Sequence, residues 1–328
     1  PQIDGRLDDE VWSRVPWTDV FVDIEGDAKP APTQATRVKM TWDERHFYIA
    51  AKLDETHVWA TLRERDSVIF HDNDFELFLD PDGDHHAYYE FEINALNTGW
   101  DLFLDKPYKD GGQADNRWDI QGLQTAVAVE GTLNDPADAD RGWTIELAIP
   151  WTALDRGRRP AVAPAAGEKW RVNFSRVEWQ HTVSDGQYAK VPNQPENNWV
   201  WSPQGIVDMH RPERWGFVEF SAATVPATTQ DGRPPAIAAD ASLAARDLLM
   251  EIYHRQRAFQ RRSGQWATKL EELAWDADLA PAWKSPPVLR RTEGGFVATL
   301  QFTAVDGVDE QWEVTQDSRL SRTRADEQ

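Results

Sequence analysis

The sequence contains no cysteine among its 328 residues. Disulfide frameworks, zinc–thiolate clusters and catalytic thiols are therefore excluded. The sequence also has no apolar run long enough to span a membrane. We expect an exported protein (periplasmic, at the cell surface or secreted). The chain starts at Pro1 rather than at a methionine, so any leader lies outside this numbering.

Catalytic and cofactor motifs are missing as well. The sequence has no Gly-x-Ser-x-Gly element, no His-Glu-x-x-His zinc motif and no glycine loop that would cradle a phosphate. We therefore expect neither a nucleophilic hydrolase nor a nucleotide cofactor. Haem is not expected either: the candidate ligands are Met40, Met209 and His210, and the last two are adjacent and cannot both be axial.

Positive charge is scarce. The chain has 35 Lys and Arg against 56 Asp and Glu, which gives a formal net charge of -21 and a sequence pI of about 4.7. Such a surface repels phosphate backbones and anionic membranes, so we expect no nucleic-acid partner and no membrane partner. An acidic excess most often serves solubility, but carboxylates also suit neutral polar ligands and calcium.

Tryptophan is the abundant residue. There are 17, and average usage would give roughly a quarter of that number. Most are expected in the core, but some lie beside Asn, Asp, Gly or Gln, where an aromatic ring can stack on a ligand. These are Trp100, Trp118, Trp179, Trp199 and Trp201. Packing at the rim of the core is the alternative for each, and we expect about two of them to contact ligand.

Apolar and polar residues alternate in several segments of residues 1–222, a pattern typical of half-buried antiparallel strands. Turn sequences such as Asp110-Gly111-Gly112 separate these segments. The sequence therefore predicts a mainly β fold, with an antiparallel β-sandwich over residues 1–222. The clearest strand segments are 45–54, 74–80, 86–94, 143–149, 170–178 and 215–220.

The pattern changes towards the C-terminus. Residues 223–240 are rich in Ala, Thr and Pro, and we interpret them as a linker. Apolar residues at helical spacing then predict a helix over 241–262 that ends near Gly264. Residues 241–328 are thus predicted to be a small α+β domain. Its other expected elements are a short helix over 268–274 and strands over 295–303 and 311–315.

One part of this C-terminal domain has a recognisable pattern. Residues 252–273, with Tyr253, Phe259, Gly264 and Trp266, resemble the helix and following loop of pilin-like and pseudopilin-like domains. The resemblance implies that residues 241–328 could contact an envelope or secretion-system protein.

Several segments of the first 220 residues occur in the order found in carbohydrate-binding module family 9, which the chain resembles. They are Ile3–Trp12, Trp42-Asp43 with Phe47–Ala50, Asp72–Asp80, Tyr88–Asn94 with Asn97, Trp143–Glu146 with Ile149–Trp151, Trp170–Arg176 and His210–Gly216. The resemblance implies a β-sandwich that binds sugar chain ends between two tryptophans and often carries structural calcium.

The chain departs from the family at one stacking position. Phe70 and His71 stand just before the acidic strand, where the family has its first stacking tryptophan. The second stacking position is similar to Trp199 or Trp201. The departure puts the clamping of chain ends in doubt and leaves the specificity open.

Polar side chains occupy the alternate positions of the predicted strands, opposite the apolar ones. They are Glu76, Glu90, Glu92, Asn94, Asn173 and Ser175. If these strands share a sheet, the side chains form a surface that can hydrogen-bond sugar hydroxyls, although an ordinary solvated sheet face is the alternative. Arg176 falls on the apolar face instead, so it requires a bulge, a carboxylate partner or a ligand. We include it, with Asn97, among the candidate sugar-binding residues.

An acidic turn is the candidate metal site. Asp80, Asp82 and Asp84 alternate around Gly83, and oxygen ligands at flexible spacing are what calcium requires. A plain acidic turn is the alternative. Four histidines are predicted to be surface side chains rather than metal ligands: His71, His85, His86 and His210.

The favoured function is binding of an oligo- or polysaccharide outside the cytoplasm, with tryptophan rings and acidic or amide side chains on one sheet face. A glycan-active enzyme is the first alternative, because Glu76, Glu90 and Glu92 could supply the two carboxylates of a glycoside hydrolase. An envelope or secretion-system interaction protein, acting through residues 241–328, is the second.

Overall fold

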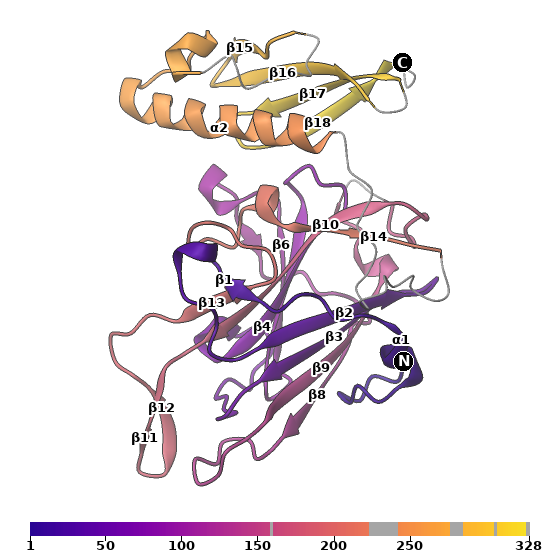
Figure 1. Ribbon diagram of the computed structural model, residues 1–328, viewed down its shortest axis with the longest axis vertical. Coiled ribbons are helices and arrows are strands. Elements are labelled where there is room, and N and C mark those ends of the chain that lie inside the picture. The colour runs from indigo at the N-terminus through magenta and orange to yellow at the C-terminus, as the bar shows by residue number, and fades with distance from the viewer. Residues whose placement is uncertain (158–159, 223–241, 276–284, 305–306, 326–328) are drawn as a thin grey trace. The chain divides into compact units, whose positions relative to one another are not determined.

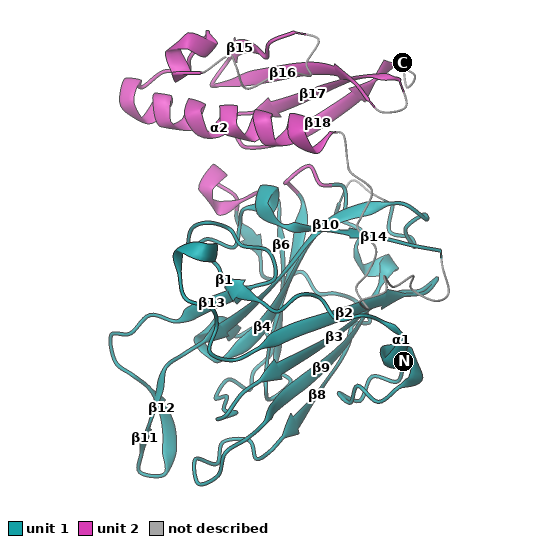
Figure 2. Ribbon diagram, viewed as in Figure 1, with its two compact units in different colours: residues 1–82, 87–105, 113–236 teal, residues 83–86, 106–112, 237–328 magenta. Residues whose placement is uncertain are grey.

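The computed structural model describes residues 1–157, 160–222, 242–275, 285–304 and 307–325. The chain forms two compact units (Figure 2), and residues 83–86 and 106–112 belong to the second unit together with residues 237–328. The fold is mainly β, as the sequence predicts, whereas the expected linker over 223–240 lies outside the described residues. No helix in the described part of the chain is both long and apolar enough to cross a membrane.

A large antiparallel sheet forms one layer of the first unit (Figure 1). The predicted strand over 74–80 is found with these bounds, and the other predicted strands begin or end within about two residues of the expected positions. In order across the sheet, the strands are β1 (Val22–Asp23), β13 (Asn197–Val200), β10 (Lys169–Glu178), β4 (Asp74–Asp80), β5 (Tyr88–Asn94), β6 (Gly99–Leu104) and β7 (Ala114–Asp115), and β14 (Gly216–Glu219) also pairs with β10.

A second antiparallel sheet forms the other layer. Its strands, in order, are β2 (Thr36–Trp42), β3 (His46–Asp54), β9 (Gly142–Pro150) and β8 (Gln124–Glu130). The inward residues of both sheets share one core, in which Phe47, Trp151, Trp170 and Phe220 pack ring against ring. Burying each such ring contributes about 2–3 kcal/mol, so these tryptophans stabilise the sandwich. The remaining elements of the first 222 residues are α1 (Glu10–Arg14), the hairpin β11 (His181–Ser184) and β12 (Gln187–Lys190), and the short 3-10 helices η1 (Gly26–Ala28), η2 (Ile69–His71), η3 (Tyr108–Asp110), η4 (Trp151–Ala153) and η5 (Pro212–Arg214).

The N-terminal motif has a structural role. The Trp12 indole donates to Glu146 on β9 at 2.6 Å, and the other oxygen of Glu146 accepts from the backbone N–H groups of Asp4 and Gly5. Gly5 has a φ of +84°, and a Cβ there would lie 2.6 Å from the Val127 carbonyl carbon. The chain therefore needs glycine at this close approach.

The second unit contains helix α2 (Leu243–Ser263) and an antiparallel sheet of β15 (Val288–Thr292), β16 (Gly295–Thr303), β17 (Asp309–Thr315) and β18 (Leu320–Arg324). The helix buries Leu249, Ile252 and Tyr253 against this sheet. It ends at Gly264, which has a φ of +73°, as expected of a left-handed C-terminal cap. The predicted second helix is the 3-10 turn η6 (Leu270–Leu273). The pilin-like resemblance stays a prediction.

A buried carboxylate organises the second unit. Asp110 accepts from the Tyr253 hydroxyl at 2.6 Å, from the Arg257 guanidinium at 3.0 Å and from the Ser318 hydroxyl at 2.6 Å. His85 and His86 also lie in this unit and are buried, which corrects their prediction as surface side chains. Their rings contact the backbone oxygens of residues 318 and 317, partners too distant in the sequence to be recognised.

Candidate ligand-binding face

Strand register brings acidic side chains together on the face of the large sheet that points away from the core. Glu76 of β4 lies directly opposite Glu92 of β5, and Asp74 lies opposite Asn94. Glu90 is on the same face as Glu92 because side chains two residues apart point the same way. We call Asp74, Glu76, Glu90 and Glu92 the acidic cluster.

The acidic cluster is buried. The exposed fractions are 0% for Asp74, 5% for Glu76, 4% for Glu90 and 2% for Glu92. Carboxylate oxygens of Asp74, Glu76 and Glu92 all lie within 4.8 Å of one another. An ordinary solvated sheet face would leave such side chains in water, so this face is a different kind of surface.

Burial and mutual repulsion raise the pKa values of the acidic cluster. Burial is the main cause for all four. It raises the pKa of Glu76 to about 7. The pKa values of Asp74, Glu90 and Glu92 lie well above their usual range, because the neighbouring Glu76 charge adds to burial. Like charges this close cannot all be ionised without a compensating group.

Several polar atoms of this face lack a partner within the described chain. They are Asp74 Oδ2, Glu90 Oε2 and the indole nitrogen of Trp100. Other carboxylate oxygens of the cluster do accept hydrogen bonds: Asp74 Oδ1 accepts from the Val177 N–H at 3.1 Å, and Glu92 accepts from the Phe70 N–H at 2.9 Å. A buried polar atom without a hydrogen bond costs about 1–3 kcal/mol, so these atoms point to a ligand, an ion or a shared proton.

Two half-buried tryptophans adjoin the acidic cluster. Trp100 of β6 lies directly opposite Glu92. Trp179 follows β10 and donates its indole N–H to the Phe70 carbonyl at 2.9 Å, next to the Phe70 N–H that Glu92 accepts. The Lys190 ammonium lies 3.4 Å from the Trp179 ring centroid, and burial lowers its pKa. Aromatic rings beside acceptor oxygens can bind a ligand with both apolar and hydroxyl surfaces.

The predicted amides have mainly structural contacts. Asn94 is buried and donates to the Leu62 carbonyl and to Asp72, while its oxygen accepts from the N–H groups of Leu96 and Thr98. Asn173 is bonded in both directions to the backbone of Ser202 at 2.9–3.0 Å. Asn97 is exposed in the turn after β5.

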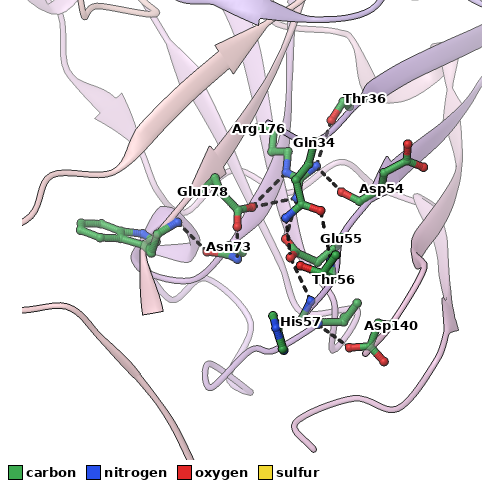
Figure 3. A network of polar contacts seen from close by, with 12 residues as sticks. Gln34, Thr36, Asp54, Glu55, Thr56, His57, Asn73, Asp140, Arg176 and Glu178 are labelled. Atoms are coloured by element: carbon green, nitrogen blue, oxygen red, sulfur yellow. Dashed lines mark hydrogen bonds and ion pairs between the residues drawn. The ribbon is translucent and has the colours of Figure 1, made fainter. Parts of the chain in front are cut away.

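Arg176 lies on the core side of the same sheet, where it has carboxylate partners, one of the three alternatives that its sequence position left open (Figure 3). Its guanidinium is 2.6 Å from Glu55 and 2.8 Å from Glu178, and it donates to the Asp54 carbonyl at 2.8 Å. The Trp199 ring centroid lies 5.2 Å away. Arg176 is therefore part of an internal network rather than of the acidic face.

The remaining predicted tryptophans belong to the core. Trp118 is 6% exposed and packs on Tyr89, and Trp199 is 4% exposed. Trp201 is half-buried against Phe174, with ring centroids 5.8 Å apart. Of the five tryptophans singled out in the sequence, the structure thus places Trp100 and Trp179 by the acidic cluster.

The acidic turn has the donor set of a hard cation. Oxygens of Asp80, Asp82 and Asp84 lie within 4.8 Å of one another, and oxygen ligands suit calcium. Sequence analysis missed a third acidic group, Asp66, Asp101 and Asp119. Arg65 forms ion pairs with all three of these carboxylates, so it supplies the compensating charge there.

Two side chains of the acidic face were not predicted from the sequence. Asp74 continues the polar alternation of Glu76 towards the start of β4, and that spacing could have identified it. Lys190 carries no such signal, because it comes from the hairpin β11–β12 and reaches Trp179 only through the fold.

Comparison with known proteins matches residues 3–200 to the family described as carbohydrate family 9 binding domain-like. No curated protein matches the chain. Among solved structures, a proposed carbohydrate-binding protein from Bacteroides uniformis is 18% identical, with a TM-score of 0.46, covering 63% of this chain and 87% of that one. A family 9 carbohydrate-binding module from Caldicellulosiruptor kristjanssonii, in complex with cellotriose, is 15% identical, with a TM-score of 0.43, covering 72% and 94%.

Proposed function

Because this chain belongs to the carbohydrate family 9 binding domain-like family, we propose that its first unit binds an oligo- or polysaccharide on the acidic face. In this proposal a sugar ring stacks on Trp100 or Trp179, and its hydroxyls donate to oxygens of Glu76, Glu90 and Glu92. Export to the periplasm, cell surface or medium, where such glycans occur, is part of the same proposal.

One observation supports the choice of this face above all others. Asp74 Oδ2 and Glu90 Oε2 are buried acceptors without partners among the described residues, and they lie in a cluster bordered by half-buried tryptophans. A sugar offers hydroxyl donors around an apolar ring face, which matches both features. Phe70 and His71 occupy the place of the family's first stacking tryptophan, so the ring contacts differ from an end clamp of two family tryptophans.

The test is a glycan array read with the full chain, followed by affinity measurements on the best ligand. We expect Trp179→Ala to lose affinity by about tenfold or more, equivalent to about 1.4 kcal/mol. Trp17→Ala is the matched control, because Trp17 is also half-buried and carries a lysine, Lys39, 4.5 Å from its ring centroid. Equal losses in both variants, or no binding to any glycan, would overturn the proposal.

A calcium ion on the turn of Asp80, Asp82 and Asp84 is a separate proposal, supported by the donor set. It would stiffen the turn between β4 and β5. We expect Asp82→Asn to weaken calcium binding at this turn and to leave glycan affinity unchanged. Unaltered calcium binding by that variant would contradict the assignment.

Glycoside hydrolysis is the second candidate function, and one observation favours it. The pKa of Glu76, raised to about 7 by burial, suits a general acid, and a second carboxylate, Glu92, lies within the short range of a retaining pair. The same array, assayed for new reducing ends, separates the candidates. A binding protein yields none, whereas an enzyme yields product that Glu76→Gln abolishes. A protein partner for residues 241–328 stays a prediction.

A further inference from the structure

We infer that Asp74, Glu76 and Glu92 hold a hard divalent cation of calcium's size, and that this cation presents the sugar hydroxyls on the acidic face. The cation part stands on the geometry of the acidic cluster alone. The part concerning sugar rests on the proposed function.

The geometry suits a calcium ion. The three carboxylates come from adjacent, registered strands, β4 and β5, so the sheet holds their backbones rigidly. Their oxygens lie within 4.8 Å of one another, and two oxygens on opposite sides of a calcium ion are about 4.6–5.2 Å apart, twice the metal–oxygen distance. Calcium takes 6–8 oxygen ligands, so three carboxylates leave positions that hydroxyl groups can fill.

The charge of the acidic cluster is uncompensated, unlike that of other buried carboxylates in the described chain. Glu55 and Glu178 pair with Arg176. Asp72 instead accepts four hydrogen bonds, from Thr61, Leu62 and Asn94. No ion pair within the described residues reaches Asp74, Glu76, Glu90 or Glu92. Their surroundings add the carboxylates of Asp72 and Glu196. The Lys190 ammonium, whose charge interacts with that of Asp74, lies over the Trp179 ring and forms no ion pair with the cluster within the described residues.

Glu90 supplies an independent indication. It lies outside the three-carboxylate group, is 4% exposed, and has one oxygen to which no described residue donates a hydrogen bond. Its charge acts directly on Asp74 and Glu92, which places it against the same group. A buried acceptor left unpaired beside three others is costly in the ion-free protein. A cation held by Asp74, Glu76 and Glu92 would also offset the charge of Glu90, and the half-buried Trp100 would provide the adjoining ring surface.

The experiment is calorimetric titration of the chelator-treated full chain with calcium chloride, and separately with magnesium chloride. The salt is added up to about 10 mM, which exceeds the dissociation constants of the weakest extracellular calcium sites. We expect wild type to show a calcium-binding event that Asp74→Asn and Glu92→Gln abolish. The matched control, Asp82→Asn, removes a carboxylate from the separate turn of Asp80, Asp82 and Asp84, and it should retain this calcium-binding event. The inference would be overturned if wild type bound no calcium. It would also be overturned if Asp82→Asn lost the calcium-binding event while Asp74→Asn and Glu92→Gln kept it.

Thermal unfolding keeps the test decisive if a variant is poorly folded. Both substitutions preserve side-chain shape and remove repulsion, so the ion-free variants should melt at or above the wild-type temperature. Calcium should raise the melting temperature of Glu90→Gln, which keeps all three ligands, by more than it raises that of Asp74→Asn, in which the turn of Asp80, Asp82 and Asp84 is the calcium site that remains. Equal calcium shifts in these two variants would contradict the assignment.

The two proposals can fail separately. Sugar binding that survives chelation unchanged would refute the cation's role and leave the proposed function standing. Calcium binding that is lost in Asp74→Asn, without affinity for any glycan, would support the cation site and refute the carbohydrate function.

Discussion

Glu178 and Glu92 are both buried carboxylates of the large sheet, but they lie on opposite faces and have different surroundings. Glu178 lies on the core side, within reach of Arg176 at 2.8 Å and of the Asn73 amide at 3.1 Å. Glu92 lies on the outer face among three other acids and accepts one backbone N–H, from Phe70. A buried acid with a built-in cation stabilises a particular fold, whereas one without it is available to a ligand.

The largest expected effect comes from removing Arg176, the cation that pairs with the buried acids on the core side of the sheet. Arg176→Met removes the guanidinium that donates to Glu55, Glu178 and the Asp54 carbonyl, and with it the cation paired with both acids. Removing one partner of a buried ion pair costs about 3–5 kcal/mol. Urea unfolding of the full chain, followed by tryptophan fluorescence, should show this loss in the transition of the first unit.

Arg37→Met is the control for that experiment, because Arg37 is an exposed side chain on β2. It should change stability by less than about 0.5 kcal/mol. If Arg176→Met costs no more than the control, Arg176 is not what compensates the buried acids, and the contrast between the two faces fails.

The pH dependence of stability sharpens the comparison. Burial raises the pKa of Glu178 from 4.5 to about 8, in spite of the opposing charge of Arg176. A raised carboxyl pKa means that the folded protein binds the proton more tightly than the unfolded chain. This contribution to stability is fully present below about pH 4.5 and is lost as the pH rises through about 8.

The stability of the first unit should therefore fall from about pH 5 to pH 8, with a contribution from Glu178 of at most about 1.4 kcal/mol per pH unit. Glu178→Gln should flatten this slope in urea unfolding measured at several pH values. A slope that is the same in wild type and variant would show that Glu178 is already ionised beside Arg176 at pH 5.

The sequence predicts the elements better than their partners. Alternation identified β4 and placed Arg176 on the apolar face, which called for a bulge, a carboxylate partner or a ligand, and the structure shows carboxylate partners. It could not identify Glu55, because that contact spans 121 positions along the chain. Flanking residues were also a poor guide to exposure. Trp118 and Trp199 lie beside polar residues in the sequence and were candidate ligand contacts, but the fold buries their rings in the core.

The same limit applies to the acidic face. The period of two shows that Glu76, Glu90 and Glu92 point away from the core, but it does not show what covers them. Segments outside the strands approach this face, including Phe70 of η2 and Trp179 after β10. A pattern of alternation therefore predicted an outward face, and only the fold reveals that it is a buried one.

The smallest expected effect is a gain in stability on the uncompensated side. Glu90→Gln removes one charge from the acidic cluster and lets its new amide donate to a neighbouring carboxylate. Because burial and the Glu76 charge both oppose ionisation of Glu90, the ion-free variant should be about 0.5–1 kcal/mol more stable than wild type at pH 8. At Glu178 the same neutralisation also removes a charge partner of Arg176, so the gain at pH 8 should be smaller than at Glu90. Equal changes in stability at Glu90 and Glu178 would mean that both faces of the sheet stabilise buried acids equally well. The lack of a compensating charge would then no longer argue for a ligand on the outer face.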